Sequence, residues 1–198
     1  MGDVSGERPL RADARRNRER VLEAARAAFS AEGSGVSLDE IARRAGVGPG
    51  TVHRHFPTKE VLFEAVVVDH LRQLADEAEA ALQAEDIGAV FFTFLLRMIR
   101  EAGVKKDLTD VLSGAGVKLS DTTRKVAADL RETFAKLLAR AQRADAVRTD
   151  VDAGEVQAIV LAALTAEQAG VAHPGRMAAL VCDCLRPRSG SLVQFDVQ

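Results

Sequence analysis

His53, Arg54 and His55 stand directly after a run of sequence that is rich in glycine. The glycines fall at positions 46, 48 and 50, and Thr51 follows the last of them. This combination fits three kinds of site: a glycine loop that cradles nucleotide phosphates, a metal site built on imidazoles, or a short helix that enters a DNA groove. Each kind of site requires different neighbouring residues, so the surrounding sequence can distinguish among the three.

The spacing argues against the first two sites. A nucleotide-binding G-x-G-x-x-G loop follows a strand and opens a helix, whereas this run has the spacing G-x-G-x-G and follows a helical pattern that ends at Ala45. His53 and His55 are two residues apart, so on a helix their side chains diverge by about 200°. The sequence contains no nucleophile paired with a base and no set of metal ligands, and therefore predicts neither an enzyme, a metal site nor a cofactor.

The third site, a helix-turn-helix, has its geometric requirements met. Ala42 supplies a small residue where two short helices cross, and Gly46 supplies a turn residue that tolerates a positive φ. Ile41, Val47 and Val52 are predicted to point inward and hold the two helices together. The other side of the second helix then offers hydroxyl and basic side chains to DNA.

Helical periodicity dominates the rest of the chain, and polar residues mark the starts of the helices. An apolar stripe recurs at helical spacing over residues 21–29 and ends at two glycines. The pairs Ser37 with Glu40 and Asp152 with Glu155 predict capping boxes. Further helices are predicted over residues 58–84, 87–102, 120–144, 156–168 and 176–185, with Thr58, Asp86 and Ser120 as caps of the first three. The fold class is therefore all-α, with about nine helices and no strand.

Composition and charge are those of a folded protein whose charge is unevenly distributed. The 198 residues are 47% hydrophobic and 28% charged, with a net charge of −2. Residues 1–60 carry 11 Lys and Arg against 9 Asp and Glu, which suits an anionic partner at this end of the chain. No apolar run approaches the roughly 20 residues of a membrane helix, and the N-terminus lacks the apolar core of a signal peptide. A cytoplasmic protein with no membrane contact is expected.

The segment Arg20–Val67 carries a family resemblance. This segment, and especially its run VLEAARAAFSAEGSGVSLDEIARRAGVGPGTVHRHFPTKEVLFEAV, resembles the DNA-binding region of the bacterial TetR-type transcriptional regulators. The resemblance implies a homodimer in which each subunit brings one recognition helix to a half-site of a palindromic DNA operator. It further implies a C-terminal domain whose last two helices form a four-helix dimer bundle, with an internal pocket for a small-molecule effector that weakens DNA binding.

Carried onto this sequence, the resemblance makes residues 48–55 the recognition helix. Its implied DNA-binding residues are Ser37, Gly48, Pro49, Gly50, Thr51, His53, Arg54, His55 and Lys59. Of these, residues 49–51 face the bases and residues 53, 55 and 59 contact phosphates, while residue 37 begins the helix that faces the DNA backbone. The family most often has tyrosine at position 53 and often serine at position 48, so operator affinity and sequence preference stay open.

Two apolar patterns belong to the C-terminal half. Residues 87–99 are aromatic and apolar on nearly all sides, which indicates a helix buried between others. The resemblance favours a pocket for an apolar or aromatic effector, lined by Phe91, Phe94, Leu95 and Met98. Two further stripes are predicted to form the dimer interface: Val156, Ile159, Val160, Ala163 and Leu164, and then Met177, Leu180, Val181 and Cys184. Ordinary intrachain core is the alternative for both patterns.

The chain is thus expected to have four parts. These are a flexible arginine-rich arm (1–14), a helix-turn-helix DNA-binding domain (15–57), a helical ligand-binding and dimerisation domain (58–187), and a loose tail (188–198). The predicted function is sequence-specific transcriptional regulation, with a repressor released by its effector. The alternatives are an activator, or a helical protein that binds a ligand or partner on the same scaffold and binds DNA only weakly.

Overall fold

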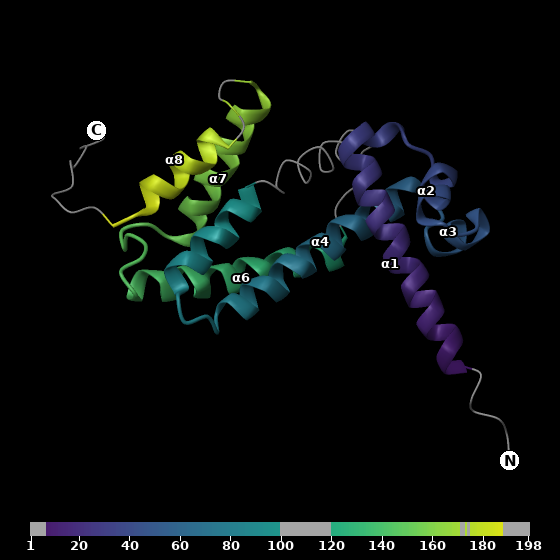
Figure 1. The fold of residues 1–198 in the computed structure, drawn as a ribbon, viewed down its shortest axis with the longest axis horizontal. Coiled ribbons are helices and arrows are strands. Elements are labelled where there is room, and N and C mark those ends of the chain that lie inside the picture. The colour runs from purple at the N-terminus through teal and green to yellow at the C-terminus, as the bar shows by residue number, and fades with distance from the viewer. Residues whose placement is uncertain (1–6, 100–119, 171–172, 174, 188–198) are drawn as a thin grey trace, which may run out of the picture. The chain divides into compact units, whose positions relative to one another are not determined.

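The computed structural model describes residues 7–99, 120–170, 173 and 175–187, and within these residues it is all-α (Figure 1). The helices are α1 (Glu7–Glu32), α2 (Leu38–Ala45), α3 (Pro49–His55), α4 (Lys59–Ala81), a helix over residues 87–99, α6 (Asp121–Arg143), α7 (Ala153–Gln168) and α8 (Arg176–Leu185). A short 3₁₀ turn, Gly33–Gly35, follows α1. Residues 100–102, the end of the helix predicted over 87–102, and the tail 188–198 lie outside the described residues. Among the described helices, none combines the length and the hydrophobicity that a membrane span requires.

Helix α1 begins earlier than the sequence analysis predicted. It starts at Glu7, so residues 7–14, expected to belong to a flexible arm, are helical. Pro9 is tolerated there because the first turn of a helix leaves its N–H groups unpaired in any case. Ion pairs between Asp13 and Arg16 (2.5 Å) and between Arg15 and Glu19 (3.6 Å) connect successive turns.

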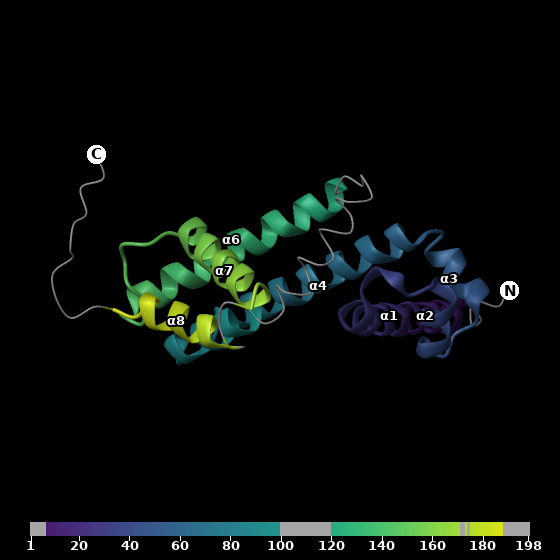
Figure 2. The same cartoon turned by 90° about the horizontal axis from the view of Figure 1, so that it is seen from above.

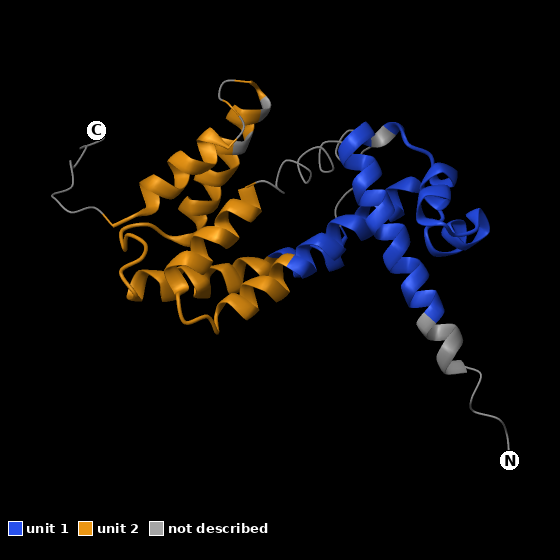
Figure 3. Cartoon of the chain, viewed as in Figure 1, with its two compact units in different colours: residues 1–73, 104–127 blue, residues 74–103, 128–198 orange. Residues whose placement is uncertain are grey.

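The apolar stripe of α1 is buried as predicted, and one of its residues packs against the start of α4. The stripe residues Val21, Leu22, Ala25, Ala28 and Phe29 are all buried. The ring of Phe29 lies 4.8 Å from the ring of Phe63 in α4, measured between centroids. Contacts of this kind place the first part of α4 with the helix-turn-helix. The described residues up to Gln73, together with 120–127, form one compact unit, and the remaining described residues form a second (Figure 3).

The predicted helix starts are confirmed at four positions. The hydroxyls of Thr58 and Ser120 accept backbone N–H bonds from residues 61 and 123, at 3.3 and 3.2 Å. Asp86 accepts from the N–H of residue 89 at 3.0 Å. Asp152 and Glu155 form a complete capping box, each side chain accepting the other's N–H at 2.8 Å. These contacts involve only residues close in sequence, which is why the sequence alone could predict them.

A carboxylate of α4 also stabilises the start of α6. Glu64 Oε1 accepts the backbone N–H of Ser120 at 2.9 Å and the hydroxyl of Thr123 at 2.6 Å. Partial burial opposes ionisation of Glu64, but the hydrogen bonds from Ser120 and Thr123 outweigh it and lower the pKa of this carboxyl. The two hydrogen bonds that Glu64 accepts are therefore strongest while its carboxyl group is ionised.

The second unit has an aromatic centre. The ring of Phe134 of α6 lies near those of Phe91 and Phe94, with centroids 6.1 and 6.4 Å away, and all three side chains are buried. Arg140, further along α6, donates to the carbonyl oxygens of Leu82 and Ala84 at the end of α4. Helices α7 and α8 lie side by side in both views (Figures 1 and 2).

Candidate DNA-binding site

Helix α2 is defined at both ends by local sequence. Ser37 caps its start by accepting the N–H of Glu40 at 3.2 Å. The reciprocal half of the predicted capping box is wrong, because the Glu40 carboxylate instead binds the guanidinium groups of Arg43 and Arg44, at 2.6 to 2.8 Å. Those hydrogen bonds lower the pKa of Glu40 to about 2. The capping-box motif alone would predict that the Glu40 carboxylate accepts a backbone N–H. The two arginines one turn away bind that carboxylate instead.

The turn between α2 and α3 depends on Gly46. This residue ends α2 in the left-handed region, with φ 63° and ψ 37°, as the sequence predicted. Its N–H bonds back to the carbonyl of Arg43 at 3.2 Å, and the N–H of Val47 bonds to that of Ala42 at 3.1 Å. Ile41 and Ala42 are fully buried, whereas Val47 is only half-buried, so it contributes less to the contact between the helices than predicted.

Helix α3 has one buried side and one exposed side. Gly48 occupies its N-cap position and Pro49 its first turn, where the missing N–H of proline costs nothing. Val52 is fully buried and Phe56, just after the helix, is nearly so. The opposite side is formed by the predicted DNA-contacting residues: Gly48, Pro49, Gly50, His53, Arg54 and His55 are exposed and Thr51 is half-buried. A Cβ added at Gly50 would meet no atom within 4 Å.

The charged groups around α3 come from three helices. His53 Nε2 lies 3.1 Å from Asp39 Oδ1 on α2, and both side chains are largely exposed. The Arg18 guanidinium of α1 lies 5.7 Å from the centre of the Phe56 ring. Lys59 begins α4 and is half-buried. The structure therefore adds Asp39 to the site, a residue that sequence reasoning missed because it lies 14 positions before the histidine that it contacts.

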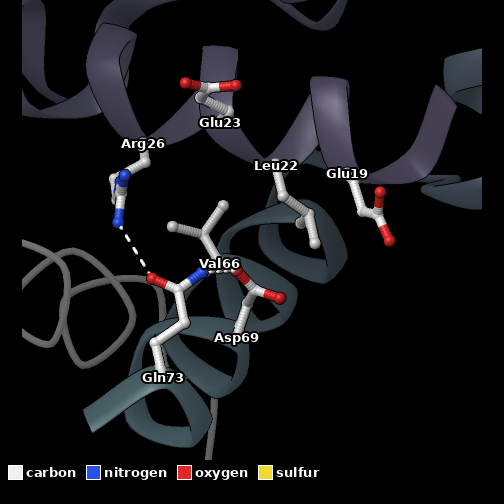
Figure 4. A pocket seen from close by; sticks show the side chains of 7 residues that line it. All are labelled: Glu19, Leu22, Glu23, Arg26, Val66, Asp69 and Gln73. Carbon is white, nitrogen blue, oxygen red and sulfur yellow. Dashed lines mark hydrogen bonds between the residues drawn. The ribbon is translucent and has the colours of Figure 1, made fainter. Parts of the chain in front are cut away.

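The residues predicted to line an effector pocket lie mostly in the core. Phe91, Phe94 and Leu95 are buried and Met98 is half-buried. Their role in lining a ligand cavity stays a prediction. A separate groove of about 460 Å³ lies in the first unit, between α1 and α4 (Figure 4). It is lined by Glu19, Leu22, Glu23, Arg26, Val66, Asp69 and Gln73.

That groove is polar at its edges and apolar at its base. Leu22 and Val66 are buried, and the other five lining residues are charged or carry an amide. Arg26 Nη1 donates to Gln73 Oε1 at 3.2 Å, and Gln73 Nε2 donates to Asp69 Oδ2 at 2.8 Å (Figure 4). The first bond joins α1 to α4 across the groove, and the second lies within α4.

The structure divides the residues predicted for the dimer interface. Val156, Val160, Ala163 and Val181 are already buried within the single chain, and their part in a dimer interface stays a prediction. Ile159 and Leu180 remain 39% and 38% exposed, Cys184 is exposed, and Met177 is half-buried. The side chain of Leu164 lies outside the described residues. Leu161, 58% exposed on α7, was not predicted.

Comparison with known proteins then decides the family. Residues 86–187 match the model for the C-terminal domain of SbtR-like transcriptional regulators, and residues 21–66 match the model for bacterial regulatory proteins of the tetR family. The chain belongs to the TetR family of transcriptional regulators. It is accordingly a DNA-binding, helix-turn-helix regulator, and the family is one of transcription regulators rather than enzymes.

Individual relatives agree with this assignment. A TetR transcription regulatory protein from Mycobacterium vanbaalenii has 45% sequence identity over 90% of this chain and 100% of its own, with a TM-score of 0.75. A TetR regulator from Streptomyces coelicolor has 28% identity over 87% of this chain and 99% of its own, with a TM-score of 0.71. An HTH-type transcriptional regulator from Staphylococcus aureus is 36% identical over 76 residues, covering 34% of this chain and 41% of that protein. Such curated relatives are therefore matched over less than half of their length.

Proposed function

We propose that this TetR-family regulator is a repressor that binds a palindromic operator as a homodimer and is released by a small apolar or aromatic effector. The observation that carries the proposal is the exposed side of α3. Its first residues are two glycines on either side of Pro49, whose ring is compact, and basic residues follow on the same short helix. A helix end with so little bulk allows the backbone to approach base edges closely, while the basic residues beside it suit phosphates.

Each predicted DNA-contacting residue has a distinct role in this proposal. Pro49, Gly50 and Thr51 approach the bases in the major groove, where the Thr51 hydroxyl and methyl group can read a base edge. His53, His55 and Lys59 bind phosphates, and Arg54 adds positive charge beside them. Ser37 places the start of α2, with its backbone N–H groups, against the DNA backbone.

The apolar surface that α7 and α8 leave uncovered supports the homodimer. Ile159, Leu161 and Leu180 are large apolar side chains with more than a third of their surface exposed. A twofold pair that buries them would carry two copies of α3, one for each half-site of a palindrome. Effector binding belongs to the second unit in this proposal, beside the aromatic cluster around Phe91 and Phe94.

Selection of bound duplexes from a random pool tests the proposal directly. The expected product is an inverted repeat whose half-site centres are a whole number of helical turns apart. Thr51→Ala should relax the preference at one base position in each half-site, whereas Lys59→Ala should weaken binding to all duplexes alike. A pool without any inverted repeat, at low salt and with dimeric protein, would contradict the proposal and favour a partner-binding role. Reporter expression from the selected operator would separate a repressor from an activator.

The effector is tested separately, by screening apolar and aromatic compounds for release of the selected operator. A Phe94→Ala variant that is folded and binds DNA normally should respond less to an active compound. An unchanged response would place the effector elsewhere.

A further inference from the structure

One arginine of α1 contacts the end of α2. Arg20 Nη2 donates to the carbonyl oxygen of Ala45 at 2.5 Å and to that of Gly46 at 2.9 Å. These carbonyls lie 25 and 26 positions further along the chain. The last carbonyls of a helix lack partners within the helix, and they carry the negative end of its dipole. A guanidinium placed there satisfies both carbonyls and meets a favourable field.

The close approach of Arg20 depends on glycine at position 46. A Cβ added to Gly46 would lie only 2.6 Å from Arg20 Nη2, so a side chain at that position would displace the guanidinium. Glycine at this position therefore permits both the left-handed backbone and the contact with α1. The residues that follow, Val47 and Gly48, lead directly into α3, so the direction in which the chain leaves Gly46 determines how α3 is presented.

We propose that Arg20 is a positioning residue for DNA recognition: by holding the turn at Gly46, it fixes the orientation in which α3 meets the major groove. This inference rests on the proposed function, in which α3 reads the operator. Arg20 acts through the backbone and does not itself read a base. Because the turn is already ordered in the free protein, binding does not have to supply the entropic cost of ordering it. This favours the specific complex.

A direct phosphate contact by Arg20 is the competing explanation, and the two make different predictions. A phosphate contact adds about −0.9 to the slope of log K against log salt, and lysine can replace arginine there as a point charge. If Arg20 instead bonds to the two carbonyls, losing these bonds leaves the salt slope unchanged. Lysine then cannot replace arginine, because its compact ammonium group cannot reproduce the bonds that the planar guanidinium makes.

The experiment compares Arg20→Met and Arg20→Lys with Arg140→Met in the full-length protein. Arg140 is a matched control because it makes the same kind of contact, to the carbonyls of Leu82 and Ala84 at the end of α4 in the second unit. Two quantities are measured for each protein: the ratio of affinities for the selected operator and for an unrelated duplex, and the salt slope on the unrelated duplex. The ratio does not change with the fraction of folded protein, so a merely structural loss leaves it as in wild type.

Both Arg20 variants should lower the affinity ratio by about tenfold, the effect of losing a hydrogen bond from a charged donor, with the salt slope unchanged. Arg140→Met should leave the ratio within about twofold of wild type, even if it melts at a lower temperature. The inference is overturned if Arg20→Met keeps the wild-type ratio, if its salt slope falls by about one unit, or if Arg20→Lys restores full discrimination. If wild-type protein prefers no duplex, the proposed function itself fails, which is a separate result.

Discussion

Replacing Gly46 by alanine should destabilise the first unit by about 2–3 kcal/mol. A left-handed conformation costs an alanine roughly 1–2 kcal/mol, and Gly46 has φ 63°. The new Cβ would also lie 2.6 Å from Arg20 Nη2. Displacing the guanidinium removes its bonds to two carbonyls, which adds about 1 kcal/mol at this partly exposed position. At about 2–4 °C per kcal/mol for a chain of this size, the melting temperature should fall by roughly 4–12 °C.

Gly50→Ala is the matched control, and it separates stability from DNA binding. Gly50 lies in α3 with open space around it. Alanine there should therefore stabilise the helix by about 0.5–1 kcal/mol. The added methyl group nevertheless stands on the surface proposed to approach the bases, so operator affinity should fall. Urea unfolding followed by circular dichroism, together with duplex binding, measures both effects. The reasoning is refuted if Gly46→Ala is as stable as wild type, or if Gly50→Ala is the less stable of the two.

Three further predictions concern charge. Lys59→Ala should flatten the slope of log K against log salt for operator binding by roughly one unit, whereas Lys136→Ala, on α6, should not change it; equal slopes would remove Lys59 from the interface. Asp39→Asn should tighten duplex binding severalfold, because it removes a negative charge 3.1 Å from His53, and weaker binding would show that Asp39 instead holds His53 in place for DNA. Glu64→Gln should cost about 1 kcal/mol of stability at pH 7. The pKa of Glu64 is lowered in the folded protein, so its contribution is fully present above the unfolded value of about 4.3 and is lost as the pH falls through the lower folded value. The stability difference between variant and wild type should therefore shrink as the pH falls below about 4.3, and a constant difference would rule out this linkage.

Features set by neighbouring residues were predicted well from the sequence. The caps at Thr58, Asp86 and Asp152 depend on residues three positions away, and the left-handed turn at Gly46 depends on a residue type. The exposed side of α3 followed from one buried position, Val52, because a seven-residue helix has only one other side to present. These predictions needed no knowledge of tertiary contacts.

Features set by distant contacts were not predicted. The bond from Arg20 to Ala45 joins residues 25 positions apart, and nothing in the sequence near Arg20 distinguishes it from its neighbouring arginines. The stripe on α7 was assigned as a whole to an interface, although Val160 is buried by the chain and the adjacent Ile159 is not. Helix α7 is apolar on several sides, so periodicity alone could not choose which side faces the interior.

The two cysteines of α8 differ in exposure, which allows a dye to be attached at one of them to follow assembly in solution. Cys182 is buried, and burial raises the pKa of its thiol, whereas Cys184 is exposed. A maleimide dye at neutral pH should therefore attach to Cys184 first, since thiolate and access both govern the reaction. That position lies on the helix whose exposed Leu180 belongs to the proposed subunit contact. Donor- and acceptor-labelled preparations, once mixed, would then report subunit exchange through energy transfer, without any engineered residue.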